Sequence, residues 1–240
     1  MKIIITKNSD TAATKAADLI MKQIKKKPDS VLGLATGNTP LGLYEKLACL
    51  YKDKKIDFYQ VKTFNLDEYI GLGKNDKTSY RYYMRTNLFN HINIKPTNIN
   101  LFDGKKINKD QATKYERKIK KAGGIDLQLL GIGHNGHIGF NEPGTKINTR
   151  TRIVKLTNST RKFNKTNFGS LAKTPKEAIT MGIGTILEAK KIILLATGQD
   201  KAEIVRKTVK GKINSQLPAS YLKNHNDAIL ILDKDAAKKI

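Results

Sequence analysis

The segment from residue 130 to residue 144 carries the densest set of chemically capable side chains in this chain. It holds two histidines, two asparagines and a glutamate among five glycines. An imidazole exchanges protons near neutral pH, and an amide or carboxylate beside it can orient the ring. We therefore predict that His137 and Glu142 form an oriented acid–base pair, with Asn135 holding one ring nitrogen or a substrate hydroxyl.

Three glycines of this segment, Gly131, Gly133 and Gly136, have the spacing of the dinucleotide-binding fingerprint. That fingerprint requires a helix starting at the third glycine and an acidic residue about 20 residues further on. Here Pro143 closes the loop, and the next strand-like run, at 152–156, ends without an acidic residue. We therefore expect no nicotinamide cofactor.

A metal site is the competing interpretation of the same loop, because His134, His137 and Glu142 are residues of the types that bind zinc. No helix is expected that would bring the two histidines onto one face, and no third histidine lies nearby in the sequence. The sequence therefore predicts neither a metal nor another cofactor.

Two adjacent carboxylates, Asp67 and Glu68, follow the apolar run at 61–66. One of them could be a general base that faces the crevice of a sheet. The alternative is an acidic pair at the start of a helix, where the helix dipole stabilises negative charge. The residues alone leave both interpretations open.

Two further loops have features of anion sites. The first contains Thr36, Gly37, Asn38 and Thr39. Its hydroxyls and its glycine could bind a phosphate at a helix start, and Thr39 is expected to cap that helix. In the second loop Lys201 opens a helix, where a cation opposes the dipole, so we expect it to serve an anion. The alternatives are an ordinary capped turn and one more surface lysine.

The elements that must position these loops alternate along the chain. Strand-like apolar runs lie at residues 2–6, 31–35, 61–66, 125–131, 152–156, 178–182, 192–197 and 228–232. Helix-like runs lie at 10–27, 40–52, 79–91, 109–122, 201–210 and 219–223. This alternation predicts an α/β fold, an open doubly wound and mostly parallel (Rossmann-like) sheet with helices on both faces. Ligands of such sheets bind outside the carboxyl ends of the strands, where all four loops would lie.

The chain is expected to form a single domain spanning 1–240, with a mobile lid around 157–175. That segment is polar, contains Gly169 and lacks a periodic apolar face. The formal net charge is +24, yet the lysines are spread along the chain and arginine is scarce. We therefore expect an anionic small-molecule substrate and no nucleic acid.

The single cysteine, Cys49, excludes an intramolecular disulfide and favours a reducing compartment. The apolar run at residues 1–6 is too short for a signal peptide or a membrane span. We expect a cytoplasmic protein with no membrane partner, either a monomer or a small homo-oligomer.

Together the loops resemble those of glucosamine-6-phosphate deaminases, which belong to the glucosamine/galactosamine-6-phosphate isomerase family. The resemblance covers nearly the whole chain. It rests on the segments Ala35–Pro40, Phe64–Tyr69, Gly131–Gly144, Thr149–Arg152 and Pro218–His225. Related 6-phosphogluconolactonases share the first loop, but they usually lack the Asp-Glu-Tyr sequence and differ in the third loop.

The resemblance implies conversion of glucosamine 6-phosphate and water to fructose 6-phosphate and ammonia, in amino-sugar catabolism, without a cofactor or metal. It implies that Asp67 takes the C2 proton and returns one to C1. It further implies that His137 opens the pyranose ring, that Glu142 and Asn135 orient that imidazole, and that the residues from Thr36 to Thr39 hold the phosphate together with Lys201.

Three departures from the family pattern carry expectations of their own. Asn135 stands where some members have Asp, so we expect a lower pKa for His137 than in those members. Thr166 stands where the family generally has a phosphate-clamping Arg, which predicts weaker substrate binding. Val154 replaces a Lys of the effector site, and the chain ends at Ile240, so we expect no activation by N-acetylglucosamine 6-phosphate.

Two alternative functions follow from the same residues. One is a related sugar-phosphate isomerase or a 6-phosphogluconolactonase-like hydrolase on the same scaffold. The other is a weakly active sugar-phosphate-binding protein, suggested by Thr166 and by the high positive charge. The presence of Asp67, His137 and Glu142 favours the active deaminase.

Overall fold

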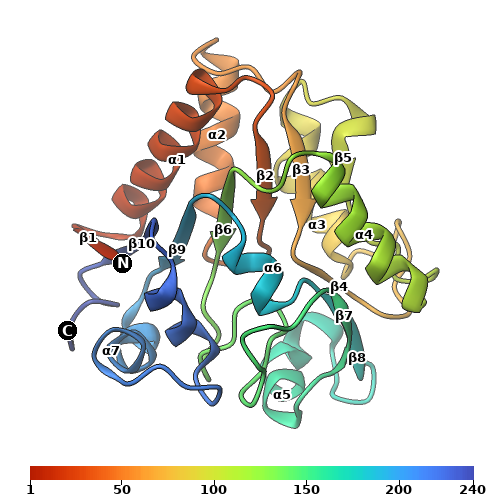
Figure 1. Ribbon diagram of the computed structural model, residues 1–240, viewed down its shortest axis with the longest axis vertical. Helices are drawn as coiled ribbons and strands as arrows, with labels where there is room; N and C mark the ends of the chain where they lie inside the picture. Colours follow the sequence, from red (N-terminus) through yellow and green to blue (C-terminus); the bar gives the residue numbers. More distant parts are fainter.

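A seven-stranded parallel sheet forms the centre of the computed structural model, which describes residues 1–240, the side chain of Lys109 excepted (Figure 1). The strand order is β1-β10-β9-β6-β2-β3-β5, and every neighbouring pair is parallel. The strands are β1 (Lys2–Thr6), β2 (Val31–Leu34), β3 (Lys62–Asn65), β5 (Ile99–Asn100), β6 (Leu127–Leu130), β9 (Ile192–Ala196) and β10 (Ala228–Asp233). The predicted mostly parallel α/β architecture is confirmed.

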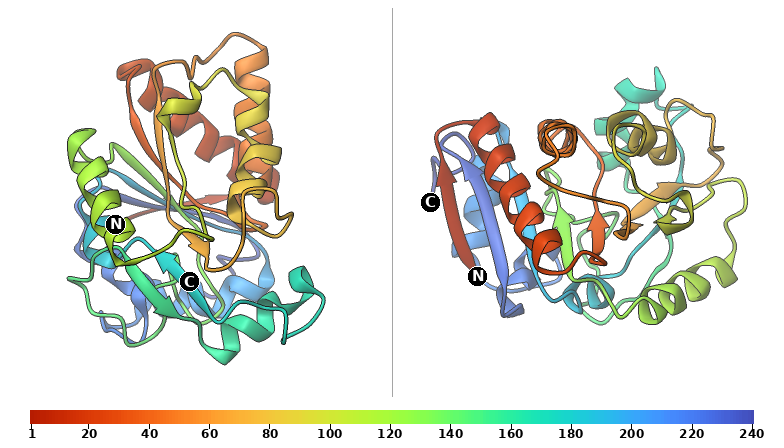
Figure 2. Two further views of the ribbon diagram at one scale, coloured as in Figure 1. Left: turned by 90° about the vertical axis from the view of Figure 1, so that its right-hand side faces the viewer. Right: turned by 90° about the horizontal axis from the view of Figure 1, so that it is seen from above.

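Helices cover both faces of this sheet. The helices of the chain are α1 (Ser9–Lys26), α2 (Leu41–Lys52), α3 (Tyr80–Asn87), α4 (Lys109–Lys121), α5 (Asn158–Phe168), which lies beside the second sheet described below, α6 (Ile183–Leu187) and α7 (Ala202–Lys210), with 3-10 turns η1 (Phe89–His91), η2 (Pro96–Asn98), η3 (Gln199–Lys201) and η4 (Pro218–Asn224). The chain crosses the sheet in one direction through α1, α2 and α3, and it returns through α4 and α7. Right-handed crossovers therefore place the two sets on opposite faces (Figure 2).

The central strands β2, β6, β9 and β10 are buried along their whole lengths, as their continuous apolar sequences predict. The direction of winding reverses between β2 and β6, since β2 leads to β3 on one side and β6 leads to β9 on the other. Such a reversal leaves a crevice at the carboxyl ends of the two strands, which is where open α/β sheets bind ligands.

A second, three-stranded antiparallel sheet corrects one part of the expected topology. It is formed by β4 (Asp67–Tyr69), β8 (Glu177–Thr180) and β7 (Arg152–Lys155), in that order. The apolar runs at 152–156 and 178–182 were expected to be strands of the central sheet, but they pair with each other and with β4. Strand β7 is only half buried, which suits a small sheet at the edge of the core.

Helix α5 lies within the segment 157–175, where no helix was expected. The Thr157 side chain caps it by accepting a hydrogen bond from the Thr160 amide, and Gly169 ends it with a φ of 76°. These local features hold a polar helix that has little apolar face. Among the described residues, no helix combines the length and apolar character needed to cross a membrane.

Candidate active site

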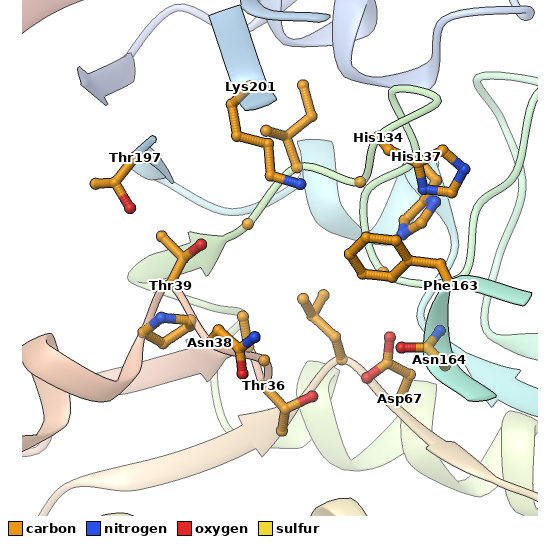
Figure 3. A pocket seen from close by; sticks show the side chains of 18 of the residues that line it. Thr36, Asn38, Thr39, Asp67, His134, His137, Phe163, Asn164, Thr197 and Lys201 are labelled. Carbon is orange, nitrogen blue, oxygen red and sulfur yellow. The ribbon is translucent and has the colours of Figure 1, made fainter. Parts of the chain in front are cut away.

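A cavity of about 610 Å³ opens at the carboxyl ends of the central strands, at the reversal between β2 and β6. Side chains from several parts of the chain surround it (Figure 3). Those that bear on function are Thr36, Gly37, Asn38, Thr39, Asp67, Tyr80, His134, His137, Phe163, Asn164, Thr197 and Lys201. Seven of the ten residues predicted as a site from the sequence are in this set.

The other three predicted residues lie elsewhere. Asn135 and Glu142 lie behind His137 and touch it or each other. Thr166 is exposed on α5 and is outside the cavity lining. The structure therefore brings the proposed acid–base groups together, but it does not bring the Thr166 side chain to them.

Asp67 begins β4 and presents its carboxylate to the cavity, although only 7% of the residue is exposed. Burial raises the pKa of Asp67 well above its usual value, and the neighbouring Glu68 raises it further. Gly139 passes so close that a Cβ on it would lie 3.4 Å from the Asp67 Oδ2 atom. A carboxylate held in this way is a stronger base than one in water, once it has lost its proton.

Glu68 has a different set of partners from Asp67. Its carboxylate accepts hydrogen bonds from the backbone amides of Tyr69 at 2.9 Å, Tyr80 at 3.0 Å and Arg81 at 2.9 Å. Burial raises the pKa of Glu68 to about 7, while these amides lower it. Asp67 faces the cavity, and Glu68 stabilises the start of α3. The expectation of an acidic pair at the start of a helix was wrong, because both residues lie in strand β4.

His137 is oriented by a chain of hydrogen bonds. The Asn135 side-chain amide donates to Glu142 Oε2 at 2.8 Å, which turns its Oδ1 atom toward His137 Nδ1 at 2.7 Å. Because Oδ1 can only accept, Nδ1 carries the proton, and Nε2 is the nitrogen available to a ligand. Gly133 is required beside it, since a Cβ there would lie 2.1 Å from the His137 Cε1 atom.

The electrostatic environment keeps this imidazole neutral. Burial lowers the pKa of His137 to about 4, against the raising effect of Glu142, whose Oε2 atom is 3.7 Å from Nδ1. His134 and Lys201 lower it further. Near neutral pH the ring is therefore neutral, and its Nε2 atom can accept a proton from a bound hydroxyl.

Replacing Asn135 by Asp is expected to raise the pKa of His137 by about one unit or more, because a carboxylate beside Nδ1 stabilises the imidazolium. An NMR titration of the His137 ring protons measures the change, and His225, which lies elsewhere in the fold, serves as an internal reference. A His137 pKa that stays at about 4 in Asn135→Asp would show that desolvation alone sets it.

The loop between β2 and α2 forms the opposite side of the cavity. Gly37 has a φ of 114°, and its carbonyl accepts a hydrogen bond from the Tyr83 hydroxyl at 2.6 Å. The expectation that Thr39 caps the next helix was wrong, because α2 begins at Leu41 with Pro40 as its N-cap and no side-chain cap. Thr39 thus keeps its hydroxyl for the cavity, next to a helix start that favours anions.

Lys201 enters the cavity from the side opposite Thr36 and Asp67 (Figure 3). Only 11% of its side chain is exposed, and its Nζ atom lies 3.5 Å from Asp200 Oδ2. This partly buried ammonium, the start of α2 and the hydroxyls of Thr36 and Thr39 together form an environment that suits a phosphate dianion.

Phe163 and Asn164 of α5, and His134, complete the rim and were not predicted as ligand-binding residues. The Phe163 ring is 58% exposed, but it stacks on His134 with centroids 5.2 Å apart, and Lys201 Nζ lies 5.6 Å from its centroid. His134 Nε2 is 2.7 Å from the Ser159 hydroxyl, also on α5. The feature of the sequence that could have indicated a role for Phe163 is its position as an aromatic residue within a polar segment.

The imidazoles of His134 and His137 do not converge as zinc ligands would. Their centroids are 6.2 Å apart at an interplanar angle of 87°, and their bonded nitrogens point to Ser159 and Asn135. Within the described residues no group of three His, Cys, Asp or Glu side chains has metal-binding geometry.

The chain matches the family model described as glucosamine-6-phosphate isomerases/6-phosphogluconolactonase over residues 6–231. The chain belongs to this family. It is 53% identical to a glucosamine-6-phosphate deaminase of Thermoanaerobacter sp. (strain X514), with 100% of this chain and 95% of the relative covered. It is 51% identical to one from Clostridium botulinum (strain Loch Maree / Type A3), covering 100% and 99%.

Solved structures with the names of this family are similar to the chain in fold. A monomeric glucosamine-6-phosphate deaminase superposes with a TM-score of 0.97 at 43% identity, with 100% of both chains covered. A 6-phosphogluconolactonase from Thermotoga maritima superposes with a TM-score of 0.77 at 22% identity, covering 97% of this chain and 99% of that one. The second similarity concerns the fold alone.

Proposed function

We propose that the chain converts glucosamine 6-phosphate and water to fructose 6-phosphate and ammonia, in amino-sugar catabolism. The observation that carries the proposal is the common cavity of Asp67, His137 and the loop at 36–39, with Lys201 opposite that loop. Support comes from relatives named glucosamine-6-phosphate deaminase, which are 51–53% identical to this chain over its full length. The volume of this cavity, about 610 Å³, suits one small sugar phosphate, and the monomeric relative supports a monomer.

The reaction begins with ring opening. The neutral His137 Nε2 atom takes the proton from the O1 hydroxyl of the pyranose and delivers a proton to O5, so that the C1–O5 bond breaks and an aldehyde forms. Asn135 and Glu142 keep the ring in the tautomer that allows this transfer.

Asp67 then carries out the isomerisation. Its carboxylate removes the C2 proton, which is acidified by the neighbouring aldehyde and the positively charged amine, and it returns a proton to C1. The product is an imine at C2, and water hydrolyses it to the ketone and ammonia. Burial raises the pKa of Asp67, which makes its carboxylate a stronger base than one in water.

A comparative assay tests the proposal against the lactonase alternative. The purified chain is incubated separately with glucosamine 6-phosphate and with 6-phosphogluconolactone, without added metal or cofactor. We expect ammonia and fructose 6-phosphate in equal amounts from the first and no enzymatic hydrolysis of the second. Lactone hydrolysis without ammonia release would favour the alternative, and binding without turnover would favour a sugar-phosphate-binding protein.

Segment 157–175 is proposed to act as a lid over the cavity. Its helix α5 contributes Phe163 and Asn164 to the cavity lining, and it is joined to the catalytic loop by the contacts of His134 with Phe163 and Ser159. Both ends of α5 are anchored, because Thr157 hydrogen-bonds Glu142 Oε1 at 3.3 Å and Phe168 packs on the Tyr69 ring. Between these ends the exposed Phe163 can move at small cost, which suits a segment that admits and encloses a substrate.

Replacing Thr166 by Arg is expected to lower KM several-fold with little change in kcat, since a guanidinium on α5 can reach further toward the phosphate than a threonine hydroxyl. Arg161 does not fill this role, because its guanidinium donates to the Leu171 and Thr174 carbonyls. Steady-state kinetics of Thr166→Arg, with Thr166→Gln as a neutral control of similar reach, measure the effect. An unchanged KM would show that the side chain at position 166 has no part in substrate binding.

A further inference from the structure

Tyr80 lies on the cavity wall and has no role so far in the proposed reaction. It is the first residue of α3, and the cavity lining includes it together with Thr36, Leu66 and Asp67. Burial raises the pKa of its phenol, to which Tyr69 and Asp67 contribute further, while the Thr36 side chain lowers it. The hydroxyl therefore lies within electrostatic range of both the proposed base and the proposed phosphate loop.

The Tyr80 ring is held from several sides. Its backbone amide donates to Glu68 Oε1 at 3.0 Å, and Glu68 is 2% exposed. The ring stacks on Phe140 of the catalytic loop, with centroids 6.0 Å apart and planes within 10°, and it also contacts the Tyr69 ring at 5.0 Å. A side chain fixed in this way is already in place when a ligand arrives, so it loses little entropy on binding.

The Tyr80 hydroxyl has hydrogen-bonding capacity to spare. It donates to the Tyr69 hydroxyl at 3.3 Å, which is long for two oxygen atoms, and the Thr36 side chain also hydrogen-bonds it. A phenol offers one donor and two acceptor positions, so these two contacts leave one acceptor position for a ligand hydroxyl. A sugar phosphate whose C2 is at Asp67 and whose phosphate is at the 36–39 loop must pass its intervening carbons beside this wall.

We propose that the Tyr80 hydroxyl hydrogen-bonds a hydroxyl on the carbon chain between the reacting carbons and the phosphate. The inference rests on the proposed function for the orientation of the substrate. Tyr80 is then a specificity-determining residue that recognises a polyhydroxylated chain of the correct length, whereas the loop at 36–39 and Lys201 recognise only the phosphate. Glu68 is the positioning residue that fixes Tyr80 through α3.

Two variants separate substrate contact from a structural role. Tyr80→Phe removes the hydroxyl of a residue that lines the cavity. Tyr69→Phe removes the other partner of the hydrogen bond between Tyr69 and Tyr80, and Tyr69 is outside the cavity lining. We expect Tyr80→Phe to lower kcat/KM for glucosamine 6-phosphate about 5-fold, the effect of one neutral hydrogen bond. Tyr69→Phe is expected to change it far less. Equal losses in the two variants would overturn the proposal.

Calorimetric binding of fructose 6-phosphate and of inorganic phosphate distinguishes failure of this inference from failure of the proposed function. Tyr80→Phe is expected to weaken fructose 6-phosphate binding about 5-fold and to leave phosphate binding unchanged. This result supports the Tyr80 contact even if the wild type releases no ammonia. Unchanged fructose 6-phosphate affinity, or an equal loss of phosphate affinity, overturns it even if the wild type is an active deaminase.

Discussion

Asp67→Asn is expected to lower kcat for glucosamine 6-phosphate about 10³-fold while leaving KM nearly unchanged. The asparagine keeps the shape of the side chain but cannot accept the C2 proton, and general-base catalysis typically contributes 10²–10⁴-fold. A coupled assay of fructose 6-phosphate formation gives both constants. A kcat within 10-fold of the wild type would assign the base to another residue.

The folded state of Asp67→Asn provides the control. The pKa of Asp67 is raised by burial, so the ionised carboxylate costs stability as the pH rises above the value of an unfolded aspartate. The amide avoids this cost, and we expect a thermal midpoint at neutral pH equal to or above that of the wild type. Lost activity in a protein of undiminished stability then reports on chemistry and not on unfolding.

His137→Gln is expected to give the second large effect, a fall in kcat/KM of about 10²-fold, because the glutamine cannot shuttle the proton from O1 to O5. His134→Gln is the matched control, since His134 belongs to the same loop and also lines the cavity, but bonds Ser159. Its loss is expected to be much smaller. Similar losses in both variants would show that the loop, and not the His137 imidazole, matters.

The pH profile adds an independent check on this assignment. The pKa of His137 is lowered to about 4, so the ring is neutral throughout the range in which the enzyme is assayed. The acid limb of the kcat/KM profile should then follow Asp67, with activity lost as the pH falls through the raised pKa of that carboxyl. The pH at the midpoint of this acid limb should be the same in His134→Gln as in the wild type.

The parts of the site that follow central strands were predictable from the sequence. The apolar runs that become β2, β6 and β9 show where the parallel strands end, and the polar loops after them meet at one edge. The residues from Thr36 to Thr39, together with His137 and Lys201, are found there for that reason.

The parts built by the second sheet and by α5 could not be predicted in the same way. Strand β4 starts at Asp67, only two residues after β3 ends, so its pairing with β8 depends on tertiary contacts rather than on a sequence pattern. Tyr80 reaches the cavity because Glu68 binds the amides at the start of α3, which is a contact across 12 residues. Phe163 reaches the rim through its stack on His134.

The fate of the C2 hydrogen tests the central claim most directly. Glucosamine 6-phosphate deuterated at C2 is incubated with the wild-type chain, and the fructose 6-phosphate is examined by NMR. If one enclosed base, Asp67, moves the proton from C2 to C1, part of the deuterium appears at C1 of the product. Ammonia is then released in an amount equal to the fructose 6-phosphate formed. Recovery of unchanged substrate with its deuterium still at C2 would contradict the proposed base and the proposed reaction together.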